Sequence, residues 1–143
     1  MPDHSSQVVR FLTEVWNHGN LDVVDELVTP ESILNDGASI TKGPQAFREY
    51  YSHMQQTFSD LRMTTHEAIS SGDYGCVRWS ATMRHTGDGL GMPATGRTLT
   101  TTGITMCRFD DVGRMIEGWQ NWDMLGLLEQ IRQAPSPRLY VTA

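Results

Sequence analysis

The stretch that decides the fold runs from Arg97 to Ile131 and reads RTLTTTGITMCRFDDVGRMIEGWQNWDMLGLLEQI. Its first part is rich in threonine, a β-branched residue that favours strands. A tight turn follows, and the run MIEGWQNW after it predicts an antiparallel neighbour of that strand. Apolar residues at helical spacing then predict a helix from about Met124 to Gln133. Two paired strands that lead directly into a helix indicate a mixed architecture.

The chain before this stretch begins with helical periodicity. Apolar residues recur at helical spacing over about 5–18 and again over 21–28, where Pro30 would end the second helix. Gly43-Pro44 opens a third helix, with the proline in the first turn, where it is tolerated. The segment PESILNDGAS between the second and third helices is expected to be a connector that holds at most a short extended piece.

The middle of the chain changes to a period of two, which is typical of strands. The run LRMTTHEAIS alternates weakly, whereas YGCVRWSATMRHTG alternates clearly and has one apolar face. That face consists of Val77, Trp79, Ala81, Met83 and His85. Helices first and consecutive strands afterwards predict an α+β fold. We expect a curved antiparallel sheet wrapped around the N-terminal helices, forming a cone that admits a small molecule, with a C-terminal helix.

Composition excludes several classes of partner. The 143 residues predict one domain over 1–143, with an extended tail at about 134–143. A formal charge of −6 and a pI near 5.2 argue against nucleic acid and anionic membranes. No signal-peptide pattern or membrane-length apolar run is present. Cys76 and Cys107 lie in strand-like runs, which favours two buried thiols and a cytoplasmic location.

Motifs for bound cofactors are missing from the sequence. There is no GxGxxG, GxxxxGK[ST], HExxH or CxxC pattern, and no GxSxG nucleophile elbow. The five histidines fall in different elements without metal-ligand spacing. We therefore expect no metal and no cofactor.

Asp123 is the most informative candidate for chemistry. With a period of two, it shares a strand face with Glu117, Trp119 and Asn121. If that face looks into the cone, the carboxylate stands in a poorly solvated place and is basic enough to take a proton from carbon next to a carbonyl. An aspartate directly before a helix is also a preferred N-cap. The two roles are compatible, because a capping residue is held rigidly.

Other polar and aromatic residues have a structural and a functional interpretation. His85 ends the apolar face of its strand, so it either reaches the same cavity or forms structural hydrogen bonds. Asn35 in ILNDG is by default a turn residue. The tryptophans Trp79, Trp119 and Trp122 are by default core residues.

Taken together, these segments resemble the SnoaL-like polyketide cyclases of the NTF2-like superfamily, from roughly Val8 to Ile131. The likeness depends on an ordered set of segments rather than on one short motif. The segments are WNHGNLDVVDELVTPE, GPQAFREYY, TFSDLRMT, SGDYGCVRWSATMRHTGDGLGMPATGRTLTTTGITMCRF and GRMIEGWQNWDMLGLLEQI. The resemblance implies a conical α+β barrel, a pocket between sheet and helices, no cofactor, and commonly a homodimer formed through the sheet.

The resemblance also implies roles for particular residues. Asp123 matches the aspartate that serves these cyclases as acid/base in an intramolecular aldol condensation. Asn35 and His85 match pocket positions of the family. On the threonine-rich strand the cyclases carry a glutamine and a histidine, whereas this chain has Gly103 and Thr105. That departure puts the ring-closing reaction in question.

Two classes of function remain open. The first is a cofactor-independent acid/base enzyme acting on a hydrophobic carbonyl compound, by aldol-type cyclisation or by epoxide opening or isomerisation in the same pocket. Asp123 would be its acid/base, and its substrate contacts would be Asn35, His85, Asn121, Trp79, Trp119 and Thr105. The second is a non-catalytic dimer that binds a small molecule and keeps the aspartate only as a cap.

The expected homodimer has a predicted surface on the second face of the sheet. Part of that face is too apolar to be left to water. Its members are Arg78, Ser80, Thr82, Ile104, Met106, Ile116 and Trp122.

Overall fold

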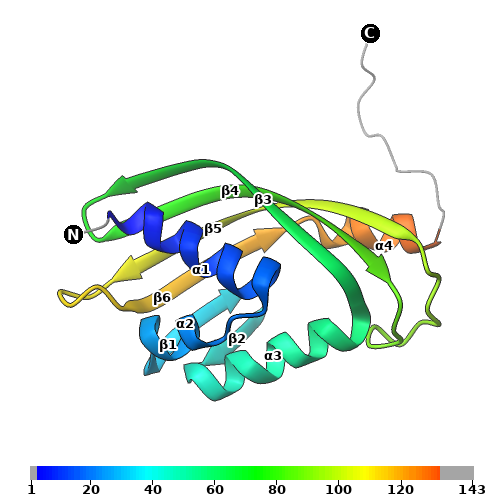
Figure 1. Cartoon of the computed structure of the whole chain (residues 1–143), viewed down its shortest axis with the longest axis horizontal. Helices are drawn as coiled ribbons and strands as arrows, with labels where there is room; N and C mark the ends of the chain where they lie inside the picture. The colour runs from blue at the N-terminus through cyan, green and yellow to red at the C-terminus, as the bar shows by residue number, and fades with distance from the viewer. Residues whose placement is uncertain (1–2, 133–143) are drawn as a thin grey trace, which may run out of the picture.

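The computed structural model describes residues 3–132 of the chain (Figure 1). The elements in chain order are α1 (His4–His18), α2 (Asp22–Leu27), β1 (Val28–Asp36), β2 (Ser39–Lys42), α3 (Gly43–Thr57), β3 (Phe58–Ser71), β4 (Tyr74–His85), β5 (Thr98–Phe109), β6 (Met115–Trp122) and α4 (Met124–Arg132). The six strands form one sheet in the order β2-β1-β6-β5-β4-β3. Strands β3 and β4 arch over α1, and α3 runs beneath them (Figure 1). The predicted tail at 134–143 lies outside the described residues.

The predicted fold class is confirmed: a curved sheet holds the N-terminal helices on its inner side, and a helix follows the last strand. The expectation of an antiparallel sheet was wrong at one place, because β1 and β6 run parallel. The connector expected between the second and third helices was also wrong. It forms β1 and β2, an antiparallel hairpin whose turn uses a positive φ of 60° at Gly37.

Pro30 explains why β1 was missed. The pairing of β1 with β6 passes from Val28 opposite Met115 to Ile33 opposite Glu117, so the residues between them lie in an irregular part of the ladder. Proline has no backbone N–H to donate to a neighbouring strand, and a strand tolerates it where the pairing is irregular. The proline therefore stands inside a strand and does not end α2, which finishes at Leu27.

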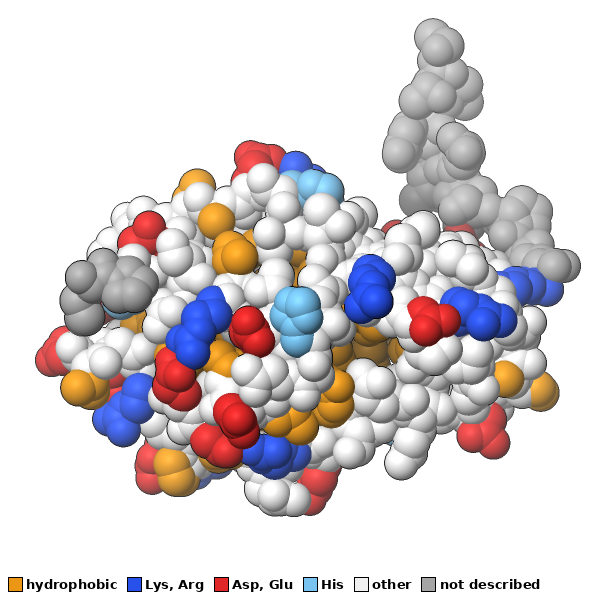
Figure 2. All heavy atoms as spheres, viewed as in Figure 1, with side chains coloured by type: hydrophobic (Ala, Val, Ile, Leu, Met, Phe, Trp, Pro, Cys, Tyr) orange, Lys and Arg blue, Asp and Glu red, His pale blue; other side chains and the backbone are white. Residues whose placement is uncertain are grey.

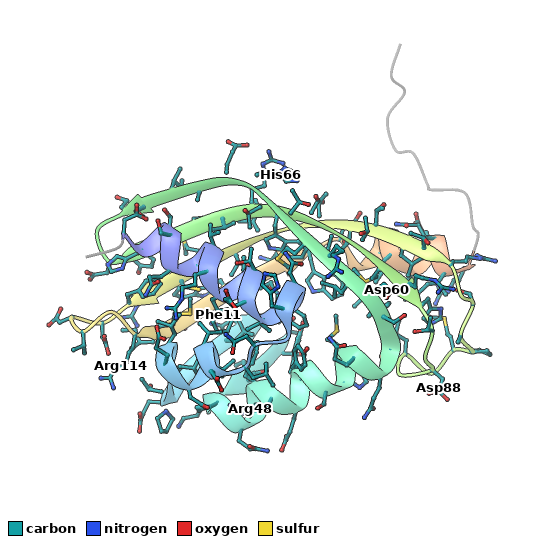
Figure 3. The ribbon with its side chains drawn as sticks, in the orientation of Figure 1. Phe11, Arg48, Asp60, His66, Asp88 and Arg114 are labelled. Atoms are coloured by element: carbon teal, nitrogen blue, oxygen red, sulfur yellow. The ribbon has the colours of Figure 1, made fainter. Side chains whose placement is uncertain are left out.

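Helix α1 is fixed at both ends by local hydrogen bonds. The Asp3 side chain accepts a hydrogen bond of 2.8 Å from the Ser6 backbone N–H, which caps the helix. Gly19 ends the helix with φ 65°. The apolar side of α1 is buried under the sheet, and Phe11 points from it into the interior (Figure 3). His66 and Arg114 point outward in the same view.

The face predicted for β4 is confirmed. Its five members have exposed fractions of 4% or less, and they are Val77, Trp79, Ala81, Met83 and His85. Strand β5 follows the same alternation, with Thr101, Gly103, Thr105 and Cys107 buried and the residues between them more exposed. These two strands form the inner wall of the cone.

Strand β6 contains a β-bulge at its start. Arg108 of β5 pairs with Glu117, but Phe109 pairs with Met115, so Ile116 has no partner on β5. One unpaired residue moves every later side chain of the strand to the opposite face of the sheet.

The bulge decides which residues of β6 reach the interior. Met115 is buried, and after the bulge Gly118 and Gln120 are buried, whereas Trp119 is half-exposed and Asn121 is exposed. The expectation that the face of Trp119 and Asn121 looks into the cone was therefore wrong. Trp122, predicted on the outer face, packs against the core.

Both cysteines are free thiols, as predicted, but only Cys107 is buried, whereas Cys76 is half-buried. Burial raises the pKa of the Cys107 thiol to about 12, so it is protonated at neutral pH. Within residues 3–132, no helix is both long and apolar enough to cross a membrane. The same residues contain no group of three or more His, Cys, Asp or Glu side chains arranged to hold a metal ion.

Candidate active site

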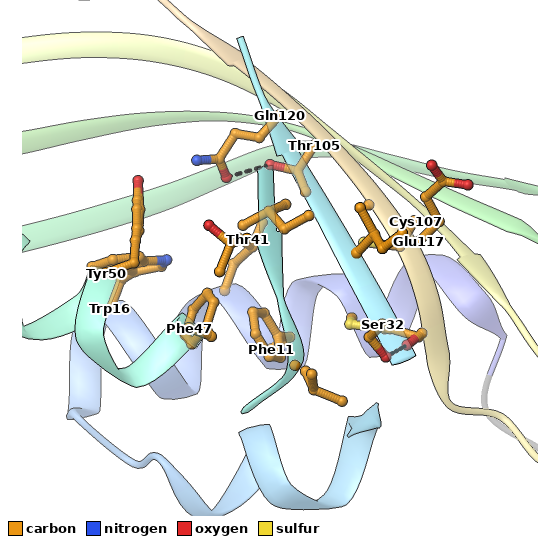
Figure 4. Close-up of a pocket in the computed structure, with 17 residues that line it drawn as sticks. Phe11, Trp16, Ser32, Thr41, Phe47, Tyr50, Thr105, Cys107, Glu117 and Gln120 are labelled. Carbon is orange, nitrogen blue, oxygen red and sulfur yellow. Dashed lines mark hydrogen bonds between the residues drawn. The ribbon is translucent and has the colours of Figure 1, made fainter. Parts of the chain in front are cut away.

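An apolar cavity of about 60 Å³ lies between α1, α3 and the inner face of the sheet (Figure 4). A second cavity of about 30 Å³ adjoins it and shares Trp16, Tyr50 and Gln120 with it. Both cavities are small, since a cavity needs about 10–15 Å³ to hold a single water. Figure 2 shows hydrophobic side chains at the floor of a hollow on this face of the molecule. Met54 of α3 and Leu61 of β3 line the second cavity.

A wider recess forms the mouth of the cone. It has a volume of about 390 Å³ and opens between α3, the β1–β2 turn and the start of α4. That volume falls in the usual range of small-molecule sites. Tyr50, Met54 and Trp122 line both the mouth and the second cavity, so these three side chains separate the mouth from the interior.

A chain of hydrogen bonds crosses the inner wall. The indole N–H of Trp79 donates to Thr105 Oγ1 over 3.0 Å. The Thr105 hydroxyl in turn donates to Gln120 Oε1 over 3.1 Å, as Figure 4 shows. All three residues are buried. Trp79 and Thr105, both predicted as substrate contacts, therefore do reach the interior, but their polar atoms are engaged with each other.

A carboxyl group and a phenol meet at the junction of mouth and interior. The Tyr50 hydroxyl donates to Asp36 Oδ2 over 3.2 Å. Burial raises the pKa of Asp36, although the bond from Tyr50 and smaller effects of Trp122 and Gln120 oppose the shift. Burial also raises the pKa of Tyr50, and the charge of Asp36 adds to this.

Sequence reasoning missed Asp36 as a site residue. It stands in ILNDG, which reads as a turn, and the aspartate is indeed next to the turn glycine. The one signal was its spacing from an apolar residue. Leu34 lies two residues before Asp36, so their side chains share a face of the sheet if the segment is a strand. Recognising that signal required recognising β1.

Asp123 caps the last helix, as one of its two interpretations predicted. Its Oδ1 accepts a hydrogen bond of 2.9 Å from the Gly126 N–H. The residue is exposed and lines a groove of about 650 Å³ on the outer face of the sheet, together with Trp119 and Asn121. The structure thus brings these three predicted residues together on the outer face of the sheet, and Asn121 also lines the mouth of the cone.

Asn35 and His85 hold structure at their positions. Asn35 lies in β1 rather than in a turn, and its amide donates to Glu117 Oε2 over 3.1 Å and to the Gly118 carbonyl over 3.0 Å. His85 is fully buried, and its Nδ1 lies 3.3 Å from the Thr95 N–H donor. His85 Nε2 has no hydrogen-bond partner among the described residues. Its contacts to Thr95 hold the 86–97 loop against β4.

A curved sheet that encloses N-terminal helices, with a cavity between them and a helix after the last strand, defines the NTF2-like class of α+β proteins. Within that class, the chain belongs to the SnoaL-like polyketide cyclase family, whose sequence profile matches residues 6–131.

Two relatives with assigned names are similar over most of the chain. Aklanonic acid methyl ester cyclase DnrD of Streptomyces peucetius is 31% identical over 137 residues, which are 91% of this chain and 92% of that protein. Aklanonic acid methyl ester cyclase DauD of Streptomyces sp. (strain C5) is 32% identical over 139 residues, 91% of this chain and 83% of DauD. The crystal structure of wild-type IdmH from Streptomyces antibioticus has a TM-score of 0.78 and 25% identity, covering 92% of this chain and 99% of IdmH.

Proposed function

We propose that this protein is a cofactor-independent acid/base enzyme that closes a ring in a hydrophobic carbonyl substrate, in the manner of a polyketide ester cyclase. The observation that carries the proposal is the likeness to DnrD and DauD, which covers 91% of this chain in each case. An apolar cavity with a half-buried carboxyl group at its entrance supports it. Such a site suits proton transfer on an apolar molecule.

The chemistry needs one group that cycles a proton. In an intramolecular aldol reaction, a base removes a proton from carbon next to a carbonyl, and the C–H electron pair becomes an enolate. The enolate carbon attacks a second carbonyl of the same molecule, a C–C bond forms, and the new alkoxide takes a proton back. Substrate and product are isomers, and hydrogen-bond donors near both oxygens lower the barrier. Two carboxylates of this chain are candidates for that group: Asp123, by its resemblance to the cyclases, and Asp36, by its place at the mouth.

The dimensions of the site indicate how a substrate would bind. The two inner cavities, of about 60 and 30 Å³, have no room for a polycyclic molecule. The mouth, at about 390 Å³, does have room for a ring system. We therefore place the body of the substrate in the mouth, against Met54 and Trp122, with its reacting edge toward the interior.

A second candidate function is a non-catalytic binder of a hydrophobic small molecule. Two observations favour it: the interior is almost filled by side chains, and Thr105, which stands where the cyclases carry a polar pocket residue, is engaged with Trp79 and Gln120. A binder would retain the mouth without turning over what it holds.

The test is a conversion assay with purified protein. Aklanonic acid methyl ester and a panel of other polyketide methyl esters are incubated with and without protein, and products of unchanged mass but altered retention are followed by liquid chromatography and mass spectrometry. Conversion at least roughly a hundredfold above the buffer rate supports the enzyme. Quenching of tryptophan fluorescence by a panel member, without conversion of any, supports the binder and overturns the enzyme.

A further inference from the structure

The carboxylates that line the cone differ in their neighbours. Glu117 lines the larger inner cavity, but it lies 3.5 Å from the Arg108 guanidinium and accepts a hydrogen bond from Asn35. Asp36 lines the mouth, and no ion pair within residues 3–132 includes it. A carboxylate held by a guanidinium is a poor base, because the cation stabilises its charged form. Asp36 carries no such partner.

The groups around Asp36 are donors in fixed positions. Gln120 is directly opposite Asp36 in the β1–β6 register. Its Oε1 accepts from Thr105, so its amide nitrogen is the end left for other partners, and it lies close enough to lower the pKa of both Asp36 and Tyr50. The hydrogen bonds from Trp79 to Thr105 and from Thr105 to Gln120 therefore fix which end of the Gln120 amide faces the Asp36 carboxyl group.

We propose that Asp36 is the group that exchanges the substrate proton, that the Tyr50 O–H positions it, and that the Gln120 amide stabilises the enolate oxygen. This inference rests on the proposed ring-closing function and names the residue that performs its proton transfer. Asp36 takes the proton as the C–H bond next to the carbonyl breaks. The enolate oxygen is stabilised by the Gln120 N–H, while the Tyr50 O–H stays on the carboxyl group. The carboxyl group then returns the proton to the alkoxide formed by ring closure, which leaves it ready for another cycle.

The geometry separates this assignment from the alternative at Asp123. Asp36 stands where the mouth meets the interior, beside the side chains that line both. Asp123 faces the outer groove, and its Oδ1 is engaged by the Gly126 N–H. A base must come within hydrogen-bond reach of the carbon acid that it deprotonates. For a substrate held in the mouth, Asp36 meets that requirement.

The matched variants are Asp36→Asn and Asp123→Asn, each isosteric and each removing one carboxylate. Two readouts are measured for the wild type and both variants: ring closure, and exchange of the substrate's α-protons in D₂O followed by NMR. The second readout detects proton abstraction even where no ring closes. We expect Asp36→Asn to lower both by at least roughly a hundredfold, and Asp123→Asn to stay within about threefold of the wild type. Circular dichroism and urea unfolding show whether each variant is folded.

A second variant tests the positioning role of Tyr50. Tyr50→Phe removes a hydrogen bond that lowers the pKa of Asp36, so the acid limb of kcat/KM should move to higher pH. Among the described residues, His53 is the other ionisable side chain that lines the mouth, so His53→Gln is the control and should leave that limb in place. A merely structural role for Tyr50 would lower activity without moving the limb.

The outcomes are distinguishable. If Asp36→Asn exchanges α-protons at the wild-type rate, or if only Asp123→Asn loses exchange, the assignment is wrong while the proposed function stands. If the wild type exchanges α-protons and closes no ring, the proposed function falls and exchange alone decides the assignment. If the wild type does neither with any panel member, both are overturned.

Discussion

The indole ring of Trp79 occupies the space in front of Gly103 on the neighbouring strand. A Cβ atom at position 103 would lie 2.3 Å from Cζ2 of the tryptophan and 2.7 Å from its Cε2. A glutamine, which the cyclases that this chain resembles carry there, cannot coexist with the tryptophan in this position. The two residues are therefore coupled. The Trp79 ring occupies the space that a side chain at position 103 would need, and its indole N–H donates a hydrogen bond to Thr105, the next inward residue of β5.

This coupling predicts a non-additive pair of substitutions. Gly103→Ala should lower the free energy of unfolding by about 1–3 kcal/mol, because the tryptophan ring must move in a packed interior. Trp79→Leu will also destabilise, but it removes the ring that the new methyl group meets. In the double variant, the loss should be smaller than the sum by at least about 0.5 kcal/mol, measured by urea unfolding. Additive losses would show that the two side chains do not compete for this space.

Asp123 gives a prediction about helix capping. Asp123→Ala should lower stability by about 1 kcal/mol, because the Gly126 N–H loses its acceptor. Asp123→Asn keeps an oxygen for that N–H and should lose well under about 1 kcal/mol. Thermal or urea unfolding of the two variants side by side measures the difference. Equal losses from both would mean that the charge, rather than the hydrogen bond, stabilises the helix.

Asp36 gives a prediction about the pH dependence of stability. Because its pKa is raised in the folded protein, the native state binds more protons than the unfolded chain between the ordinary aspartate pKa, about 4, and the raised one. The free energy of unfolding contributed by this group therefore falls as pH rises through that window. Asp36→Asn lacks the effect, so its stability relative to the wild type should increase with pH and then level off.

The measurement is urea unfolding of the wild type and Asp36→Asn at several pH values between about 4 and 7. Other titrating groups are shared by the two proteins and cancel in the difference. A difference that stays constant with pH would contradict the raised pKa. A variant that is less active but at least as stable at neutral pH would match the usual trade-off at a functional site.

The outer face of the sheet predicts a homodimer. Ile104 is 51% exposed there and lines the outer groove with Met106 and Trp119. A second copy would cover this apolar surface. Light scattering at tens of micromolar should give twice the 16.1 kDa of one chain, and Ile104→Lys should halve that mass. Val112→Lys is the control, because Val112 is 72% exposed but lies in the β5–β6 turn. A wild-type particle of single-chain mass would contradict the dimer.

The parts of the fold that the sequence predicted are those with unbroken periodicity. Strand β4 alternates over its whole length, and its inward side chains from Val77 to His85 were predicted residue by residue. The helices α1 and α3 carry apolar stripes that local caps and a proline delimit. In these elements local pattern and tertiary burial agree, so the pattern was sufficient.

The site was harder to predict because two local events override the pattern. Pro30 concealed β1 and, with it, the inward position of Asp36. The bulge at Ile116 reversed the faces of β6, so Gln120 was overlooked while Asn121 was placed in the cone. Neither the irregular pairing around Pro30 nor the bulge at Ile116 produces a periodic pattern in the sequence. Each depends on which residue of a neighbouring strand lies opposite.

The unpaired Ile116 determines which side chains of β6 face the cavity. If the strand kept all its residues but paired regularly with β5 from Met115 onward, its two faces would be exchanged, so that Trp119 and Asn121 would enter the cone and Gln120 would leave it. Deleting Ile116 alone would remove the bulge and leave Gln120 inward, because Met115 and Glu117 already lie opposite neighbouring residues of β5. For relatives of this fold, an aligned residue after the bulge shares a function only when the bulge itself is shared.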